Sequence, residues 1–133
     1  MANLTRIKQI EILSFGYKYR QIPKANLVVD VRFLKNPYYD EALRSCSGLD
    51  QVIQDYVLNQ KACQDFLMMF SQMLPLLLNG YDSFGTSHDS IVIAFGCTGG
   101  KHRSVTLAIE CSKMLAGLTK VQVEVNHLDL GKE

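Results

Sequence analysis

The segment that most constrains the fold of this chain is IVIAFGCTGGKHRSVTLAIECSKML, residues 91–115. It opens with an apolar run typical of a buried strand, and from Arg103 onward its apolar residues recur at helical spacing. Glycines at positions 96, 99 and 100 separate the two parts, which predicts a tight turn from strand to helix. A strand that passes directly into a helix is typical of layered α/β domains.

The rest of the chain fits that class of fold. Alternation predicts a first strand over 7–15, and LVVDVRF predicts a second strand over 27–33, apolar enough to be buried on both faces. Asp50 is placed to cap a short helix, and a longer helix runs from residue 59 or 60 to about 79, where Pro75 should kink or end it. We further expect a loop over 79–90, a strand over 91–96, a helix over 103–118 and a last strand over 120–128.

We therefore predict one α/β domain over residues 1–133, with a layered sheet of about four mainly parallel strands and flanking helices. In such sheets, ligands bind beyond the carboxyl ends of the strands. That end carries GCTGG after the third strand and RFLKNP after the second.

Composition excludes several classes of protein. Fourteen basic residues against thirteen acidic ones give a net charge of +1, so no global nucleic-acid signal is present. The N-terminus does not resemble a signal peptide, and the most apolar segment, over 66–78, contains a proline and is too short to span a membrane. The four cysteines form no C-x-x-C pair, which predicts reduced thiols, no metal site and a cytoplasmic protein without a cofactor.

The turn between the third strand and its helix combines features that suit a bound anion. Its glycines let a ligand approach the backbone, and the helix begins with unpaired N–H groups and the positive end of its dipole. Lys101, His102 and Arg103 add cationic donors, of which Arg103 can hold two oxygens at once. Thr98 or Ser104 can supply a hydroxyl donor. Because cations are unfavourable at a helix N-terminus, a bound phosphate, sulfate or carboxylate would relieve their repulsion.

Two other interpretations of this turn stay open. In the first, the glycines only tighten the connection. In the second, Cys97 to Ser104 fits C-x-x-G-x-x-R-S and looks like the phosphate loop of cysteine-dependent protein phosphatases, where a thiolate attacks phosphorus. Gly96 stands where that family usually has histidine, so a non-catalytic Cys97 packed under the loop is favoured. The candidates for the acid that protonates the leaving group are Asp30, Asp82 and Asp89. A Walker A loop is excluded, because histidine follows the lysine.

The block GCTGGKHRSV, at 96–105, resembles the most characteristic motif of the C-terminal domain of the bacterial RapZ (YvcJ) family. The segment over 14–58, which includes DVRFLKNP, is similar to a second part of that domain, and VNHLDL at 125–130 looks like its closing H-R-D element. The resemblance spans nearly all of residues 7–130.

This resemblance implies a fold similar to a phosphofructokinase subdomain. Full-length members carry an N-terminal P-loop kinase-like domain, which this sequence lacks. The enteric member senses glucosamine-6-phosphate, binds a small RNA, presents it to an endoribonuclease and self-associates. For this chain the resemblance implies a non-enzymatic, homo-oligomeric domain that binds a phosphorylated (amino) sugar or a similar phosphate and signals to a protein or RNA partner.

The same resemblance, together with the turn, gives the candidate ligand-binding residues. Asp30 and Arg32 alternate along one strand and so share a face, where Asp30 can accept bonds from sugar hydroxyls or an amino group. The alternative is a structural ion pair at a sheet edge. Tyr38 follows Asn-Pro, where the family often has histidine, which leaves the ligand's identity open. The complete set is Asp30, Arg32, Tyr38, Thr98, Gly99, Gly100, Lys101, His102, Arg103 and Ser104.

A third candidate function is an RNA-binding adapter without ligand sensing. It requires that the cations of residues 18, 20, 24, 44, 101 and 103 converge on one face. Leu128, where arginine is expected, and the absence of a basic tail weaken this alternative. His127 is a candidate to close the ligand site, whereas His88 is expected to be a loop residue without a role. The apolar stripe over 66–78 is expected to be core, and any exposed part of it an oligomer interface.

Overall fold

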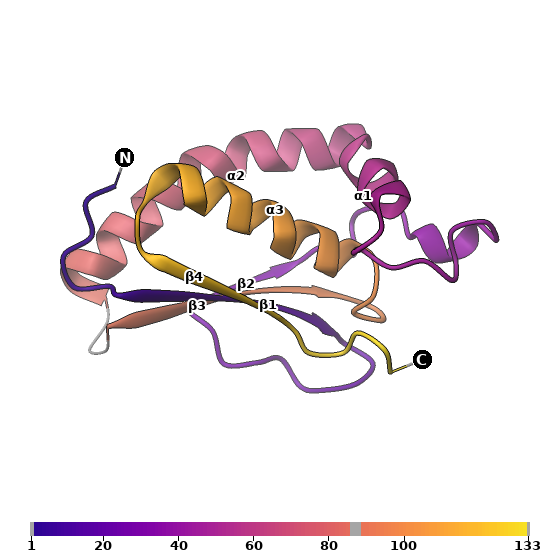
Figure 1. The fold of residues 1–133 in the computed structure, drawn as a ribbon, viewed down its shortest axis with the longest axis horizontal. Helices are drawn as coiled ribbons and strands as arrows, with labels where there is room; N and C mark the ends of the chain where they lie inside the picture. The colour runs from indigo at the N-terminus through magenta and orange to yellow at the C-terminus, as the bar shows by residue number, and fades with distance from the viewer. Residues whose placement is uncertain (1, 86–88, 133) are drawn as a thin grey trace.

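A computed structural model describes residues 2–85 and 89–132 and contains a four-stranded sheet under three helices (Figure 1). The strands are β1 (Gln9–Gly16), β2 (Leu27–Asp30), β3 (Ser90–Cys97) and β4 (Gln122–His127). They lie in the order β2-β3-β1-β4, and all three pairings are parallel. The predicted α/β class, with about four mainly parallel strands, is confirmed.

The helices α1 (Gln51–Leu58), α2 (Lys61–Gly80) and α3 (Arg103–Leu118) lie on one face of the sheet (Figure 1). Isoleucines of β1 and β3, together with Phe95 of β3, pack with the buried residues of these helices in the main core. On the opposite face runs the connection from β1 to β2, over 17–26, which has no helix (Figure 1). It covers a smaller apolar cluster around Leu13, Phe15 and Ala94.

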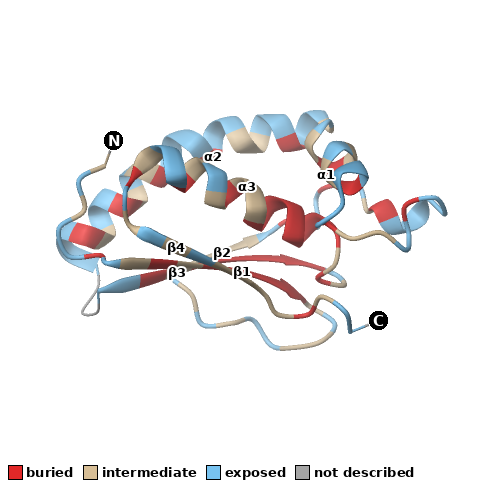
Figure 2. Ribbon diagram, in the orientation of Figure 1, coloured by how far each residue is buried: buried red, intermediate tan, exposed pale blue. Residues whose placement is uncertain are grey.

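The predicted passage from a strand over 91–96 into a helix over 103–118 is confirmed. β3 begins at Ser90 and α3 covers the predicted residues 103–118. Figure 2 shows that the first half of α3 is buried, whereas the outer side of α2 is largely exposed. The start of α3 is buried because β1, β3 and α1 all pack around it.

The prediction of a second strand over 27–33, buried on both faces, is wrong. β2 ends at Asp30, which is exposed, and its three apolar residues are only half-buried. The reason is its position at the edge of the sheet, where it pairs with β3 alone. Val31 and Leu34 then turn the chain back into the core, so Arg32 lies in a turn rather than in the strand.

The C-terminal end of α2 also differs from the expectation. The helix continues through Pro75 to Gly80, so the proline does not end it. Residues Tyr81–Gly85 form a π-helical turn, η2, instead of the predicted loop. This turn is anchored by Asp82, whose carboxylate accepts the backbone N–H groups of three residues before β1. His88, expected in the same loop, lies outside the described residues.

The apolar stripe over 66–78 is core on one side of α2 only. Phe70, Leu74 and Leu78 are buried, as predicted. Met73, also predicted to face the core, is exposed, because it lies on the solvent side of the helix together with Met68, Met69 and Leu76. None of the helices in residues 2–85 and 89–132 has the length and apolar character needed to cross a membrane.

Candidate functional site

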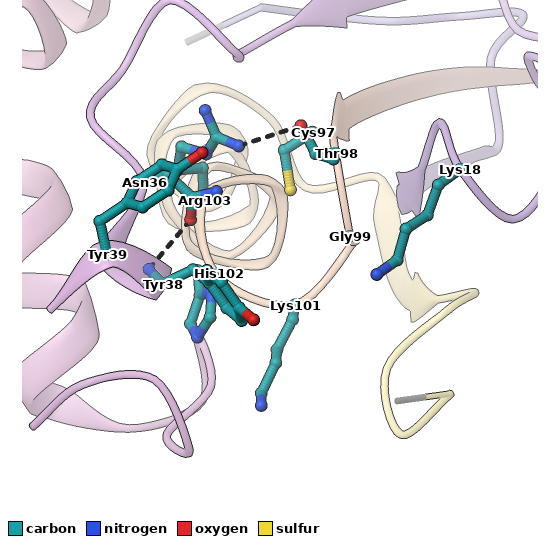
Figure 3. Close-up of a pocket in the computed structure, with 10 residues that line it drawn as sticks. All are labelled: Lys18, Asn36, Tyr38, Tyr39, Cys97, Thr98, Gly99, Lys101, His102 and Arg103. Atoms are coloured by element: carbon teal, nitrogen blue, oxygen red, sulfur yellow. Dashed lines mark hydrogen bonds between the residues drawn. The ribbon is translucent and has the colours of Figure 1, made fainter. Parts of the chain in front are cut away.

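A cavity of about 280 Å³ lies where the chain leaves β3 and turns into α3 (Figure 3). Its wall comes from Lys18 in the connection after β1, from the short 3-10 helix η1 (Pro37–Tyr39) with its N-cap Asn36, from the end of β3 and from the glycine turn. In Figure 3, Tyr38 and Tyr39 lie on one side of the turn, and the side chain of Lys18 points toward it from the other. The residues that line the cavity are Lys18, Asn36, Tyr38, Tyr39, Cys97, Thr98, Gly99, Lys101, His102 and Arg103.

The backbone of the turn leaves its N–H groups available to a ligand. Gly100 has a φ of +66°, and a Cβ there would lie 2.7 Å from the backbone nitrogen of Gly16, so only glycine fits this position. Within residues 2–85 and 89–132, the N–H groups of Thr98 and Gly99, which line the cavity, donate to no backbone carbonyl. They lie beside the N-terminus of α3, whose dipole adds a positive potential.

Arg103 makes structural contacts that its position in the motif does not predict. It is 4% exposed, and its Nη1 donates to the carbonyl oxygens of Arg32 at 3.2 Å and Leu34 at 3.0 Å. Its Nη2 donates to Thr98 Oγ1 at 3.4 Å. These bonds use three of the five N–H groups of the guanidinium and connect the turn after β2 to the glycine turn. The buried Nε has no hydrogen-bond partner among the described residues.

His102 and Lys101 line the cavity and donate hydrogen bonds to the segment that precedes α1. His102 is 5% exposed, and its Nε2–H donates to the carbonyl oxygen of Cys46 at 2.7 Å. Because a carbonyl only accepts, this bond fixes Nε2 as a protonated nitrogen. Lys101 Nζ donates to the carbonyl oxygen of Arg44 at 3.0 Å. Both side chains therefore line the cavity and at the same time fix its shape.

Cys97 lies at the floor of the cavity and is 2% exposed. Its Sγ lies 3.1 Å from Ser104 Oγ and accepts the backbone N–H of Ser104 at 3.4 Å. Ser104 is itself fully buried and does not line the cavity. The pair thus joins the end of β3 to the first turn of α3 beneath the loop.

A family model of the RapZ C-terminal domain matches residues 8–131 of this sequence. The chain belongs to the RapZ C-terminal domain family. Three curated relatives, each called a nucleotide-binding protein, come from Agathobacter rectalis, Saccharopolyspora erythraea and Acidothermus cellulolyticus; they are 45%, 43% and 44% identical over 93%, 94% and 92% of this chain. The chain covers 42%, 42% and 40% of these proteins, so the RapZ relatives are more than twice as long as the part they share with it.

The structure does not bring every residue expected for a RapZ-like ligand site to the cavity. Asp30 and Arg32 do not line it. They form an exposed ion pair with an Nη2–Oδ2 distance of 2.6 Å, and Arg32 also lies 3.8 Å from the centre of the Tyr17 ring. The hydrogen bond from Arg32 lowers the pKa of Asp30. Asp30 and Arg32 thus have the position expected for a structural ion pair at a sheet edge, which was the alternative to a role in ligand binding. Gly100 supports the turn from outside the cavity, against Gly16.

Four lining residues were not predicted as part of the RapZ-like ligand site, and one of them, Cys97, was named only for the phosphatase alternative. Lys18 appeared only among the cations of the RNA-binding alternative, although it follows the carboxyl end of β1, where ligand sites are expected. Asn36 and Tyr39 flank the predicted Tyr38 in the same short segment. Asn36 and Tyr39 could have been predicted from the sequence NPYY, because these four residues form the short 3-10 helix η1 and its N-cap.

The cations of the RNA-binding alternative are partly engaged elsewhere. Arg20 pairs with Asp129, and the guanidinium of Arg44 lies over the ring of Tyr38 while its Nε donates to the Tyr38 carbonyl. His127 does not line the cavity; its Nδ1 lies 2.6 Å from Ser14 Oγ, and burial lowers its pKa. In the described part of the chain, no three His, Cys, Asp or Glu side chains are grouped so that they could hold a metal ion.

Proposed function

We propose that this domain binds a phosphorylated small molecule, such as a phosphorylated sugar, at the turn over 98–103 and signals its presence to a protein or RNA partner. The main support is the combination of backbone and charge in the cavity. Among the described residues, the N–H groups of Thr98 and Gly99 make no backbone hydrogen bond, and Lys18, Lys101 and Arg103 line the same space. No carboxylate of the described residues lines the cavity, so an anion has no like charge to overcome.

The buried Nε of Arg103 is a second observation in favour of a ligand. An unsatisfied N–H of a charged group, removed from water, costs free energy, and such groups are rare in folded proteins. Arg103 lines the cavity, so an oxygen atom of a ligand, or a water that it orders, can accept this hydrogen. The side chain thus combines a structural role through Nη1 and Nη2 with a buried Nε–H that has no acceptor among the described residues.

Isothermal titration with inorganic phosphate and hexose phosphates tests this proposal. We expect binding to the unmodified domain, and about tenfold weaker binding for Lys18→Gln, because a charge-assisted hydrogen bond is lost. Lys24→Gln is the matched control, since Lys24 is exposed on the same connection but does not line the cavity. A folded sample that binds neither phosphate nor any hexose phosphate would contradict the proposal, as would an equal loss in both variants.

A cysteine-dependent phosphatase is the second candidate function. Cys97 lines the cavity, and its sulfur accepts the backbone N–H of Ser104 at the start of α3. Turnover would also need an acid for the leaving group, and no carboxylate of the described residues lines the cavity. Hydrolysis of an aryl phosphate that Cys97→Ser abolishes would establish this activity. Binding of phosphate without turnover supports the sensing function instead.

Signalling requires a partner, and two surfaces support the proposal of one. The exposed apolar side chains of Met69, Met73 and Leu76 follow one another along α2, which supports self-association or a protein partner. Sedimentation should then show a larger species that Leu76→Glu dissociates. For RNA, Lys18 and Lys101 at the cavity are the cations to test, and affinity should fall steeply with salt. If the protein is a monomer at all concentrations and binds no RNA at low salt, self-association and RNA binding are both contradicted, and only the ligand-binding part of the proposal remains.

A further inference from the structure

We infer that Asp129, which does not line the cavity, is a positioning residue for the ligand site over 98–103. Its buried carboxylate acts from behind the glycine turn, through the backbone of Gly16. The inference rests on the phosphate site proposed above and deepens it, because it names a residue outside the cavity that sets the affinity of that site.

The glycine turn packs directly on the last residue of β1. A Cβ on Gly16 would lie 2.7 Å from the carbonyl carbon of Gly99 and 2.9 Å from the backbone nitrogen of Gly100, so no side chain separates the two backbones. The chain after β1 continues this contact, since the N–H of Lys18 donates to the carbonyl oxygen of Thr98 at 3.2 Å. The position of the end of β1 therefore sets the position of the ligand-facing N–H groups of Thr98 and Gly99.

Asp129 holds this end of β1 in place. Its Oδ2 accepts the backbone N–H of Gly16 at 2.8 Å. Its Cβ lies 3.0 Å from the place that a Cβ of Gly100 would take, so the same side chain packs against both the strand and the turn. Because the side chain is fully buried outside the cavity lining, it can affect a ligand only through the backbone that it supports.

The carboxylate is itself held by two cations. Arg20 donates to both of its oxygens, at 2.9 Å from Nε and 2.7 Å from Nη2, and Lys132 Nζ donates to Oδ1 at 2.7 Å. Charge-assisted bonds of this kind are short and directional, so the carboxylate has little freedom to follow a displaced Gly16. A turn supported in this way loses little conformational freedom on binding, which favours affinity.

The C-terminal segment also reaches a cation of the cavity, through the ring of Tyr19. Tyr19 Oη donates to the carbonyl oxygen of Lys132 at 3.2 Å. The ring centre lies 5.9 Å from Lys132 Nζ and 5.1 Å from the Nζ of Lys18, which lines the cavity. The segment over 128–132 thus supports the ligand site at the glycine turn and at Lys18.

Positioning and electrostatics predict opposite effects of the same substitution. Asp129→Asn removes a negative charge from behind an anion site, and Coulomb's law alone predicts that an anion then binds more tightly. The substitution also brings an amide NH₂ group among the donors of Arg20, Lys132 and Gly16, which weakens the hold on Gly16. If the turn depends on that hold, phosphate binds more weakly in spite of the favourable change of charge.

Isothermal titration of the full chain with inorganic phosphate and hexose phosphates tests this role. We expect Asp129→Asn to bind them about tenfold more weakly, at a temperature where its denaturation curve shows a folded protein. Asp82→Asn is the matched control, because Asp82 is also buried and accepts three backbone N–H groups, but at the opposite end of β1. It should lose stability and keep its affinity. In NMR spectra without ligand, the amide resonances of Thr98 and Gly99 should shift in Asp129→Asn and not in Asp82→Asn.

A second pair of variants conserves charge and applies if Asp129→Asn does not fold. Arg20→Lys keeps the positive charge beside Asp129 but loses the two-point contact, so we expect about threefold weaker phosphate binding. Arg6→Lys is its control, since Arg6 precedes β1 and its Nη1 donates to the carbonyl oxygen of Ser83, at the other end of the strand. Its affinity for phosphate should equal that of the unmodified protein.

The outcomes separate this role from the function on which it rests. If the unmodified protein binds no phosphate compound, the proposed ligand site is itself wrong. If it binds them and folded Asp129→Asn binds them as tightly or more tightly, only the positioning role is overturned. Equal weakening in Asp82→Asn, or unshifted resonances of Thr98 and Gly99, overturns it as well. If Asp129→Asn is unfolded, an Arg20→Lys variant that binds as tightly as Arg6→Lys overturns the role.

Discussion

The guanidinium of Arg20 and the carboxylate of Asp129, which are 109 positions apart, form a two-point ion pair with distances of 2.9 Å from Nε and 2.7 Å from Nη2. The Asp129 carboxylate is fully buried and also accepts the backbone N–H of Gly16 at 2.8 Å and Lys132 Nζ at 2.7 Å. The Asp129 side chain borders Gly100, which supports the glycine turn. One carboxylate thus joins the C-terminal segment, the end of β1 and the connection under the sheet.

Replacement of this carboxylate should destabilise the fold. We expect Asp129→Asn to lower the free energy of unfolding by about 2–3 kcal/mol, because Arg20 loses its charged partner and the buried donors lose an ionised acceptor. Urea denaturation followed by circular dichroism measures the change. Asp65→Asn is the control: it breaks the exposed Lys61–Asp65 pair and should change stability by less than about 0.5 kcal/mol. Equal effects of the two substitutions would contradict the role of Asp129.

A second buried carboxylate predicts the response of the protein to acid. Hydrogen bonds from the backbone N–H groups of Ile7, Thr5 and Arg6 lower the pKa of Asp82 from 3.8 to about 2. Because the folded-state pKa lies below the unfolded one, the ionised carboxylate stabilises the fold above about pH 4. That contribution is lost as the pH falls from about 4 through about 2.

Asp82→Asn isolates this contribution. The variant should be less stable than the unmodified protein at neutral pH, and the difference should shrink as the pH falls through the window between about 4 and about 2. Chemical denaturation at a series of pH values measures it. A difference that stays constant over this range would show that the carboxylate's charge does not matter, and that only its size or shape does.

Replacing glycine with alanine should have opposite effects on stability at Gly100, before α3, and at Gly117, near its C-terminal end. Gly100→Ala should cost at least about 1–2 kcal/mol, because alanine resists a positive φ and its Cβ would overlap the backbone of Gly16. It should also weaken phosphate binding, since the N–H groups of the turn shift. Gly117→Ala should instead stabilise the protein by up to about 1 kcal/mol, because Gly117 lies in the helix with open space around it. Thermal unfolding compares the two; a stable Gly100→Ala variant would refute the close-contact argument.

The four free cysteines should differ in reactivity. Burial raises the pKa of the Cys63 thiol to about 11 and that of the Cys111 thiol to about 12, so neither forms a thiolate near neutral pH. Cys46 is only half-buried. Brief treatment with iodoacetamide, read by mass spectrometry, should therefore label Cys46 before Cys63 and Cys111, and concentrated urea should remove the difference. Early labelling of Cys111 in the folded protein would contradict this order.

Sequence patterns predicted the elements whose signals are local. The bounds of α3, Arg103 and Leu118, match the helix predicted over 103–118 from helical spacing after a glycine turn. The end of β2 could not be predicted in this way, because an apolar run does not show whether a strand lies at the centre or the edge of a sheet. The same limit applies to Pro75, which the packing of α2 tolerates.

The candidate site shows the same division between local and distant signals. The turn from Thr98 to Arg103 was predicted as a unit because its residues are consecutive. The structural role of Arg103 could not be predicted, since the carbonyls it binds belong to Arg32 and Leu34, which are 71 and 69 positions away. Lys18 joins the cavity for a similar reason, because only the parallel pairing of β1 with β3 brings it there.

The pairing of β1 has a consequence for the order in which the chain folds. Gln9 lies opposite Ser90 in one neighbouring strand and Gln122 in the other, so β1 has no partner close to it in sequence. During synthesis, this apolar segment leaves the ribosome long before either partner exists. Such distant pairings make folding slow, because long loops must close first. The nascent sheet should therefore depend on protection from aggregation until β4 has been made.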